Sequence, residues 1–269
     1  MPSLEWNKET WNKNYSWEKG GAEWSEAWGE SPAAQWVSTI LPRINSFLPC
    51  NSILEIAPGF GRWTEFLLTY CNNYTGIDLS QRCIDHCKSI FNKGNFFTND
   101  GYSLSDAPDG AFDFVFSFDS LVHAEREVIE SYLLQIAQKL SENGVAFLHL
   151  SNFQELPAGT PNPHGRDESV SATFVREFLA KNKIPLLVQE KIGWGGEILV
   201  DQFILIAKKG SIGQPTIIEN PHFMQEATLA TNVFQHYVDP FDCKSFCKPR
   251  SSFWKKLIPA FLQKNKKLS

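Results

Sequence analysis

The residues best suited to bind a ligand through their backbone form a short glycine turn. The apolar run Ser52–Ala57 leads into Pro58-Gly59-Phe60-Gly61, and helical spacing resumes at Arg62. Between a strand and a helix, such a turn lets backbone N–H groups and the helix N-terminus approach a ligand closely. A dinucleotide site would need a third glycine where this sequence has Thr64, so the pattern disfavours a nicotinamide-dependent oxidoreductase.

An acid ends the next apolar run. The run Tyr74–Asp78 places Asp78 nineteen residues beyond Gly59. A carboxylate at the carboxyl end of a second parallel strand can accept both hydrogen bonds of a ribose diol. Asp78 is therefore expected to bind a ribose.

The glycine turn and its flanks resemble a known motif. The segment LEIAPGFGRWTEFL is similar to motif I of class I S-adenosylmethionine (SAM)-dependent methyltransferases, although Ala57 stands where that family usually has its first glycine. The resemblance implies that Glu55 and the backbone of residues 57–61 hold the methionine portion of SAM. It also implies that Asp100 reaches the adenine amino group, with Gly101 leaving room for the ring.

The resemblance continues to about residue 150. The run Phe112–Ser117 and the following FDSLVH resemble motif IV, whose residues line the cofactor and face the substrate. Several features in the right order are more specific than any one of them. The cofactor-binding residues expected for SAM are Glu55, Ala57, Gly59, Gly61, Asp78, Leu79, Asp100, Gly101 and Phe118.

His123 is the candidate catalytic residue. Methyl transfer is an in-line displacement that mainly requires alignment and exclusion of water, and a base is needed only for a hydroxyl or protonated amine acceptor. His123 follows the fourth strand at the carboxyl edge of the sheet, and imidazole titrates near neutral pH. The alternative is that His123 only caps or packs at a helix start.

Several residues outside the cofactor motifs are expected to bind the acceptor. Asp119 lies in the motif IV segment, Asn152 emerges at a strand end, and the long loop 153–168 carries His164 and Arg166. Loops of this length in compact domains are often lids or binding loops, although a solvated loop is the alternative. Trp24 and Trp28, one helical turn apart, either close over the ligand or pack a helix on the sheet.

The elements that must position these residues alternate along the chain. Strands are expected at 52–57, 74–78, 95–98, 112–117, 144–150, 184–192 and 198–208, and helices at 33–47, 62–71, 81–91, 126–140 and 171–182. Such alternation predicts a doubly wound α/β fold with a mostly parallel, seven-stranded sheet. The last two strands are joined by only five residues, so the final strand must be antiparallel, as in the Rossmann-like class I methyltransferase fold.

Three regions are expected. Residues 1–48, with six tryptophans in the first 36, form an aromatic helical cap, and residues 49–209 form the methyltransferase domain. Residues 210–269 form an extension with a basic amphipathic helix around 253–262. That helix either packs on the acidic body or contacts an anionic membrane surface.

Composition excludes some functions. The net charge is −5, and residues 1–243 hold 17 basic against 30 acidic residues, which does not suit a nucleic-acid binder. The six cysteines follow neither a disulfide framework nor a CxxC pattern, so no metal is expected. The absence of a signal peptide or long apolar run predicts a cytoplasmic protein without a transmembrane segment.

The sequence thus predicts a SAM-dependent enzyme that methylates an oxygen or nitrogen of a small molecule or glycan. A likeness to bacterial methyltransferases of glycan or secondary-metabolite pathways is carried by the 149–152 strand end, the loop motif His164-Gly165-Arg166-Asp167 and the tryptophan hairpin. The alternative is a non-catalytic SAM-fold module that acts through a protein partner. Oligomeric state has no signature here.

Overall fold

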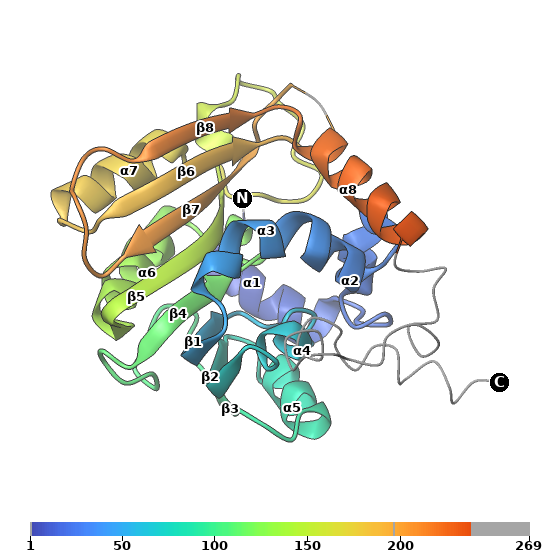
Figure 1. Cartoon of the computed structure of the whole chain (residues 1–269), viewed down its shortest axis with the longest axis vertical. Helices are drawn as coiled ribbons and strands as arrows, with labels where there is room; N and C mark the ends of the chain where they lie inside the picture. The colour runs from blue at the N-terminus through green and yellow to red at the C-terminus, as the bar shows by residue number, and fades with distance from the viewer. Residues whose placement is uncertain (1, 196, 238–269) are drawn as a thin grey trace.

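The structure, a computed structural model, describes residues 2–195 and 197–237 and contains one sheet with helices on both faces (Figure 1). The strand order is β3-β2-β1-β4-β5-β7-β6-β8. The strands are β1 (Cys50–Ile56), β2 (Cys71–Asp78), β3 (Asn95–Thr98), β4 (Phe112–Ser117), β5 (Leu140–Ser151), β6 (Leu186–Ile192), β7 (Asp201–Ala207) and β8 (Thr216–Asn220).

The helices alternate with these strands after an N-terminal helical region. They are α1 (Leu4–Glu9), α2 (Pro32–Gln35), α3 (Leu41–Ile44), α4 (Thr64–Leu67), α5 (Gln81–Ile90), α6 (Arg126–Lys139), α7 (Ala172–Lys181) and α8 (Phe223–Tyr237). Short helical turns are η1 (Thr10–Asn14), η2 (Ala22–Trp28), η3 (Trp36–Ile40), η4 (Asn45–Phe47), η5 (Leu121–His123) and η6 (Phe153–Glu155).

The pairing of the strands confirms the expected α/β class and its reversed strand. Strands β1 to β5 are parallel to one another, whereas β7 is antiparallel to both β5 and β6. The sheet has eight strands, so the predicted count of seven is wrong. The extra strand β8 pairs parallel with β6 at the sheet edge, and most of its side chains are exposed, so it lacks the apolar alternation that identifies a half-buried strand.

Two expected helices differ in extent. The helix predicted at 62–71 is the single turn α4, because β2 already begins at Cys71 and pairs with Cys50. The helix predicted at 33–47 starts as expected, with the Ser31 side chain accepting from Ala34 N–H. It is divided into α2, η3, α3 and η4. Pro42 lies in the first turn of α3, next to the boundary with η3, and it interrupts the helical hydrogen bonds because it has no N–H.

The core lies on both faces of the sheet. On one face, residues of the N-terminal region such as Trp36 and Ile40 pack with α4, α5 and α8 against the strands. Trp36 stacks on Phe66 with ring centroids 5.0 Å apart. On the other face, α6 and α7 bury apolar residues including Ile136 and Val175. Because helices cover both faces of the sheet, a ligand site is expected at the carboxyl edge of its strands.

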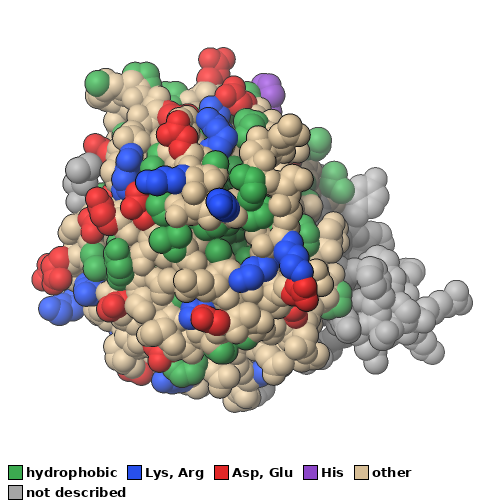
Figure 2. All heavy atoms as spheres, turned by 90° about the vertical axis from the view of Figure 1, so that its left-hand side faces the viewer, with side chains coloured by type: hydrophobic (Ala, Val, Ile, Leu, Met, Phe, Trp, Pro, Cys, Tyr) green, Lys and Arg blue, Asp and Glu red, His purple; other side chains and the backbone are tan. Residues whose placement is uncertain are grey.

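Acidic and basic side chains are interspersed over the face shown in Figure 2, which is seen from the left of Figure 1. Within residues 2–195 and 197–237, the structure holds no helix both long and apolar enough to cross a bilayer. The expected basic helix at 253–262, together with Cys243 and Cys247, lies outside the described residues.

Candidate active site

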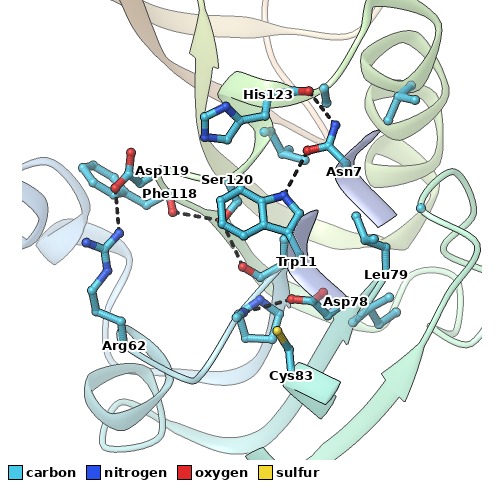
Figure 3. A pocket seen from close by; sticks show the side chains of 18 of the residues that line it. Asn7, Trp11, Arg62, Asp78, Leu79, Cys83, Phe118, Asp119, Ser120 and His123 are labelled. Atoms are coloured by element: carbon cyan, nitrogen blue, oxygen red, sulfur yellow. Dashed lines mark hydrogen bonds and ion pairs between the residues drawn. The ribbon is translucent and has the colours of Figure 1, made fainter. Parts of the chain in front are cut away.

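A cavity of about 1010 Å³, including its open mouth, lies at the carboxyl ends of β1, β2 and β4 (Figure 3). The sheet side is lined by the glycine turn, by Asp78 and Leu79, and by residues 118–121. The opposite wall comes from the N-terminal region, through Leu4, Asn7, Trp11, Trp17 and Trp24. Its walls combine apolar rings with a few charged groups, as is common for small-molecule sites.

The glycine turn forms a left-handed floor under the cavity. Ala57, Gly59 and Gly61 have φ values of +58°, +57° and +85°. Ala57, the departure from motif I, therefore adopts the conformation that a glycine would adopt, at a strain of about 1–2 kcal/mol for a residue with a Cβ. The turn keeps its shape despite the substitution, and Ala57 and Gly59 line the cavity.

Gly61 and Gly101 make close approaches possible. A Cβ on Gly61 would lie 2.5 Å from the Phe91 ring, and a Cβ on Gly101 would lie 2.5 Å from Leu4 Cδ1. Gly101 lines the cavity and lets the N-terminal helix approach it, whereas Gly61 packs behind the turn and is not among the lining residues. The two glycines thus shape the site in different ways.

Asp78 sits at the end of β2 with its carboxylate turned to the turn. Oδ2 accepts from Gly59 N–H at 2.9 Å, and Oδ1 accepts from Ser80 N–H at 2.8 Å. The residue is only 5% exposed, and burial raises the pKa of its carboxyl while the two N–H donors lower it. Each carboxylate oxygen keeps a further lone pair for a ligand hydroxyl.

Glu55 and Asp100 are placed differently from what the resemblance implied. Glu55 is buried beneath the floor, where it accepts hydrogen bonds from Thr64 Oγ1 at 2.7 Å and from the Tyr74 hydroxyl. Burial raises its pKa to about 7. Asp100 is exposed and accepts from the backbone N–H groups of residues 102 and 103. Neither residue lines the cavity.

His123 is held in one orientation at the cavity wall. Its Nδ1 lies 2.8 Å from the Gly165 carbonyl oxygen, which can only accept, so Nδ1 carries the proton and Nε2 keeps its lone pair. Nε2 has no hydrogen-bond partner among residues 2–195 and 197–237. The ring is 6% exposed and packs beside Trp6 and Trp11. Burial lowers the pKa of His123, so the imidazole is neutral near pH 7.

Asp119 lines the same cavity as His123. It has a φ of +61°, its carboxylate accepts from Arg62 Nη2 at 2.7 Å, and its backbone N–H donates to His149 Nδ1 at 3.1 Å. Figure 3 shows Arg62 reaching from the glycine turn to Asp119, with Phe118 next to them. Phe118 and Asp119 both line the cavity.

The remaining predicted acceptor residues divide into two groups. Trp24 lines the cavity, whereas Trp28 is buried and packs edge-on against Trp194 at 6.1 Å. Asn152, Arg166 and His164 are not among the lining residues. Asn152 joins Leu199 to the start of α7, Arg166 binds Asp201, and His164 is exposed.

Sequence reasoning did not identify several lining residues. Arg62 directly follows the glycine turn, and its position was a signal that it could reach the carboxyl edge. Asn7 and Trp11 come from the N-terminal region, where the aromatic content predicted packing on something apolar without showing which ring would meet the site. Asn7 Nδ2 donates to the His123 carbonyl oxygen at 2.8 Å, and Trp11 Nε1 donates to Asn7.

Metal binding has no support in the described part of the chain, where no three His, Cys, Asp or Glu side chains are grouped to hold an ion. The groups that the site presents include carboxylates, an imidazole and backbone N–H and carbonyl groups. These groups can bind hydroxyls, hold a cation near an anion and accept a proton.

Comparison with known proteins bears on this chemistry. Residues 53–144 match the family model described as a methyltransferase domain. The fold is similar to a SAM-dependent methyltransferase from Clostridium acetobutylicum (TM-score 0.56, 14% identity, 70% of this chain and 98% of that chain). It is also similar to SAM-dependent methyltransferases from Leishmania major (0.56, 10%, 76% and 82%) and Archaeoglobus fulgidus (0.52, 16%, 69% and 98%). No curated protein matches the sequence.

The match of residues 53–144 to a methyltransferase domain supports the expected enzyme class. At these identities, the likeness to solved structures establishes the Rossmann-like fold. The acceptor is a separate question, which depends on the cavity.

Proposed function

We propose that this enzyme transfers the methyl group of SAM to an oxygen or nitrogen of a small molecule or sugar, with His123 as general base. The observation that carries the proposal is the single cavity that brings Asp78, Asp119 and His123 together at the carboxyl ends of β2 and β4. Asp78, proposed to bind the ribose, and the neutral imidazole of His123 can therefore contact ligands bound in the same cavity.

The residues present fit SAM. Asp78 has free lone pairs for the ribose hydroxyls, and the left-handed turn at Ala57 and Gly59 lets the backbone approach the methionine portion. Leu79, Gly101 and Phe118 supply apolar contacts on the same side. When bound, SAM supplies an electrophilic methyl group for in-line displacement.

On the acceptor side, the protein aligns the acceptor group and removes its proton. Because Gly165 fixes the proton on Nδ1, His123 Nε2 can take a proton from an acceptor hydroxyl or ammonium group. The Asp119–Arg62 pair offers a carboxylate to polar groups of the acceptor. Trp11 and Trp24 give this side flat apolar walls, which suit a ring-shaped acceptor and exclude water.

Cofactor binding is tested by calorimetry with SAM. Asp78→Asn removes a charged acceptor of hydrogen bonds worth about 1.5–3 kcal/mol, so the dissociation constant should rise about 10- to 100-fold. Asp100→Asn, which changes an acid after the neighbouring strand outside the cavity, should leave it unchanged. Equal weakening in both variants would contradict the assigned ribose site.

The role of His123 is tested by release of S-adenosylhomocysteine with a panel of sugar, phenol and amine acceptors. His123→Gln should lower turnover of the acceptor that reacts by about 10²–10⁴-fold while the affinity for SAM stays the same. His164→Gln, at an exposed histidine of the adjacent loop, is the matched control and should retain full turnover. Retained turnover in the His123 variant would remove it from catalysis.

A further inference from the structure

A cluster of buried polar residues lies next to the cavity without lining it. It consists of the buried residues Asp201, His149 and Arg166 with the half-buried Trp194, and it is called here the Asp201 cluster. Asp201 is the first residue of β7 and is fully buried. Its Oδ1 accepts from Arg166 Nε at 2.8 Å, and its Oδ2 accepts from Trp194 Nε1 at 2.5 Å.

The charge of Asp201 is maintained despite its burial. Burial alone would raise the pKa of Asp201, but the Arg166 guanidinium and His149 hold it well below its ordinary value. Burying an ionised pair costs free energy that packing with apolar residues would not, so such a pair is weak evidence for a role in stability. What the cluster touches is therefore more informative than the pair itself.

One arm of the cluster leads to Asp119. The Asp119 backbone N–H donates to His149 Nδ1, so Nδ1 must be unprotonated and the proton of this imidazole must lie on Nε2. Nε2 lies 3.2 Å from Asp201 Oδ2, although its N–H is not well aligned with that oxygen. The carboxylate thus favours the one tautomer of His149 that can hold Asp119 in its left-handed conformation, with φ at +61°.

The other arm leads to His123. Arg166 is bound to Asp201, and the preceding residue, Gly165, provides the carbonyl oxygen that fixes the proton of His123 on Nδ1. The loop is also held by a hydrogen bond from Asp167 N–H to the Val122 carbonyl at 2.8 Å. Arg166 adds a side-chain contact from the loop to β7 beside this backbone contact.

We propose that Asp201 is a positioning residue of the methyl-transfer site, which sets the orientation and tautomer of His123 through Arg166 and the conformation of Asp119 through His149. The proposal rests on the roles given above to His123 and Asp119. Asp201 itself touches neither ligand nor reacting atoms. A single buried carboxylate thereby connects β5, β7 and the loop 153–168 to Asp119 and His123 in the cavity.

A merely structural ion pair would stabilise the fold without selecting a tautomer, so the test reads the tautomers directly. Protein labelled with ¹⁵N-histidine gives imidazole ¹⁵N signals that distinguish a protonated from an unprotonated nitrogen, and His123→Gln and His149→Gln assign the two rings. The wild type should show His123 protonated on Nδ1 and His149 protonated on Nε2.

Asp201→Asn should abolish both single-tautomer patterns and give mixtures of the two tautomers at each ring. The matched control is Glu190→Gln on β6, which removes another buried carboxylate bound to an arginine, Arg43, at 2.6 Å. This control should leave both histidine patterns as in the wild type. Unchanged tautomers of either ring in the Asp201 variant, or equal changes in the control, would overturn the proposal.

Asp201→Asn leaves the buried Arg166 without a counter-charge, so the double variant Asp201→Asn with Arg166→Met is measured as well and should show the same losses. Single variants separate the arms: Arg166→Gln should disturb only the His123 pattern, and His149→Gln should leave that pattern intact. Calorimetry with S-adenosylhomocysteine runs in parallel. Absence of binding to the wild type refutes the cofactor site, whereas the tautomer readout tests Asp201 independently of it.

Discussion

Glu55 makes the stability of the fold depend on pH in an unusual direction. Its carboxyl is buried under the cavity floor, and its pKa rises from 4.5 to about 7 through burial, against the hydrogen bonds from Tyr74 and Thr64. Between these two values the unfolded chain has lost the proton while the folded protein retains it. Stability therefore falls as pH rises through this window, and the loss is complete above the folded pKa.

The magnitude follows from the shift. A difference of about 2.5 units at 1.36 kcal/mol per unit gives about 3 kcal/mol between acid and mildly alkaline solution. Glu55→Gln removes the titrating group, while its amide oxygen can still accept from Thr64 and Tyr74. The variant should lose this pH-dependent contribution. Its unfolding free energy should therefore fall less than that of the wild type when the pH is raised from 5 to 8.

Urea unfolding followed by tryptophan fluorescence at pH 5 and pH 8, without SAM, measures this. The fall in unfolding free energy between the two pH values should be about 2–3 kcal/mol larger for the wild type than for the Glu55 variant. Glu177→Gln, at an exposed acid on α7, should behave as the wild type. The same pH dependence in wild type and Glu55→Gln would refute the raised pKa.

Two further variants test the packing around the site. Gly61→Ala combines left-handed strain with a clash against Phe91 and should cost about 2–4 kcal/mol in urea unfolding, whereas Gly29→Ala, at φ +68° in open space, should cost only about 1 kcal/mol. Equal losses would show that Phe91 moves freely. Arg43→Met leaves Glu190 buried without its cation and should cost about 3–5 kcal/mol by the same assay, and a loss below 1 kcal/mol would contradict the pairing.

The sheet was predictable from sequence because its strands carry strong local signals. Apolar runs ending in Asp78 and Ser117, separated by helical periodicity, predict parallel strands, and the short 193–197 turn predicts the reversed strand. Strand β8 gave no such signal, since its exposed edge position needs no apolar alternation. The first long helix is divided at Pro42. The helical spacing of apolar residues continues on both sides of this proline, so the sequence predicted one unbroken helix.

The site was predictable in part for the same reason. Residues at strand ends, such as Asp78 and Asp119, reach the cavity because parallel strands present their carboxyl ends at one edge. Glu55 lies within a strand buried on both faces, where sequence does not show on which side a charge finds its partners. Arg166 and Asn152 have polar side chains that bind other protein groups, and such long-range pairing leaves no local pattern.

The cavity joins two parts of the chain with different sequence signals, and this bears on acceptor choice. The domain match at 53–144 includes Asp78, Asp119 and His123, which line the cavity and which the proposed function assigns to methyl transfer. The opposite wall comes from Leu4 to Trp24, outside that match, and it meets the acceptor side through the indole rings. Because these rings bound the space that the proposed function leaves for the acceptor, we expect acceptor specificity to depend on the N-terminal cap and donor binding to depend on the matched domain.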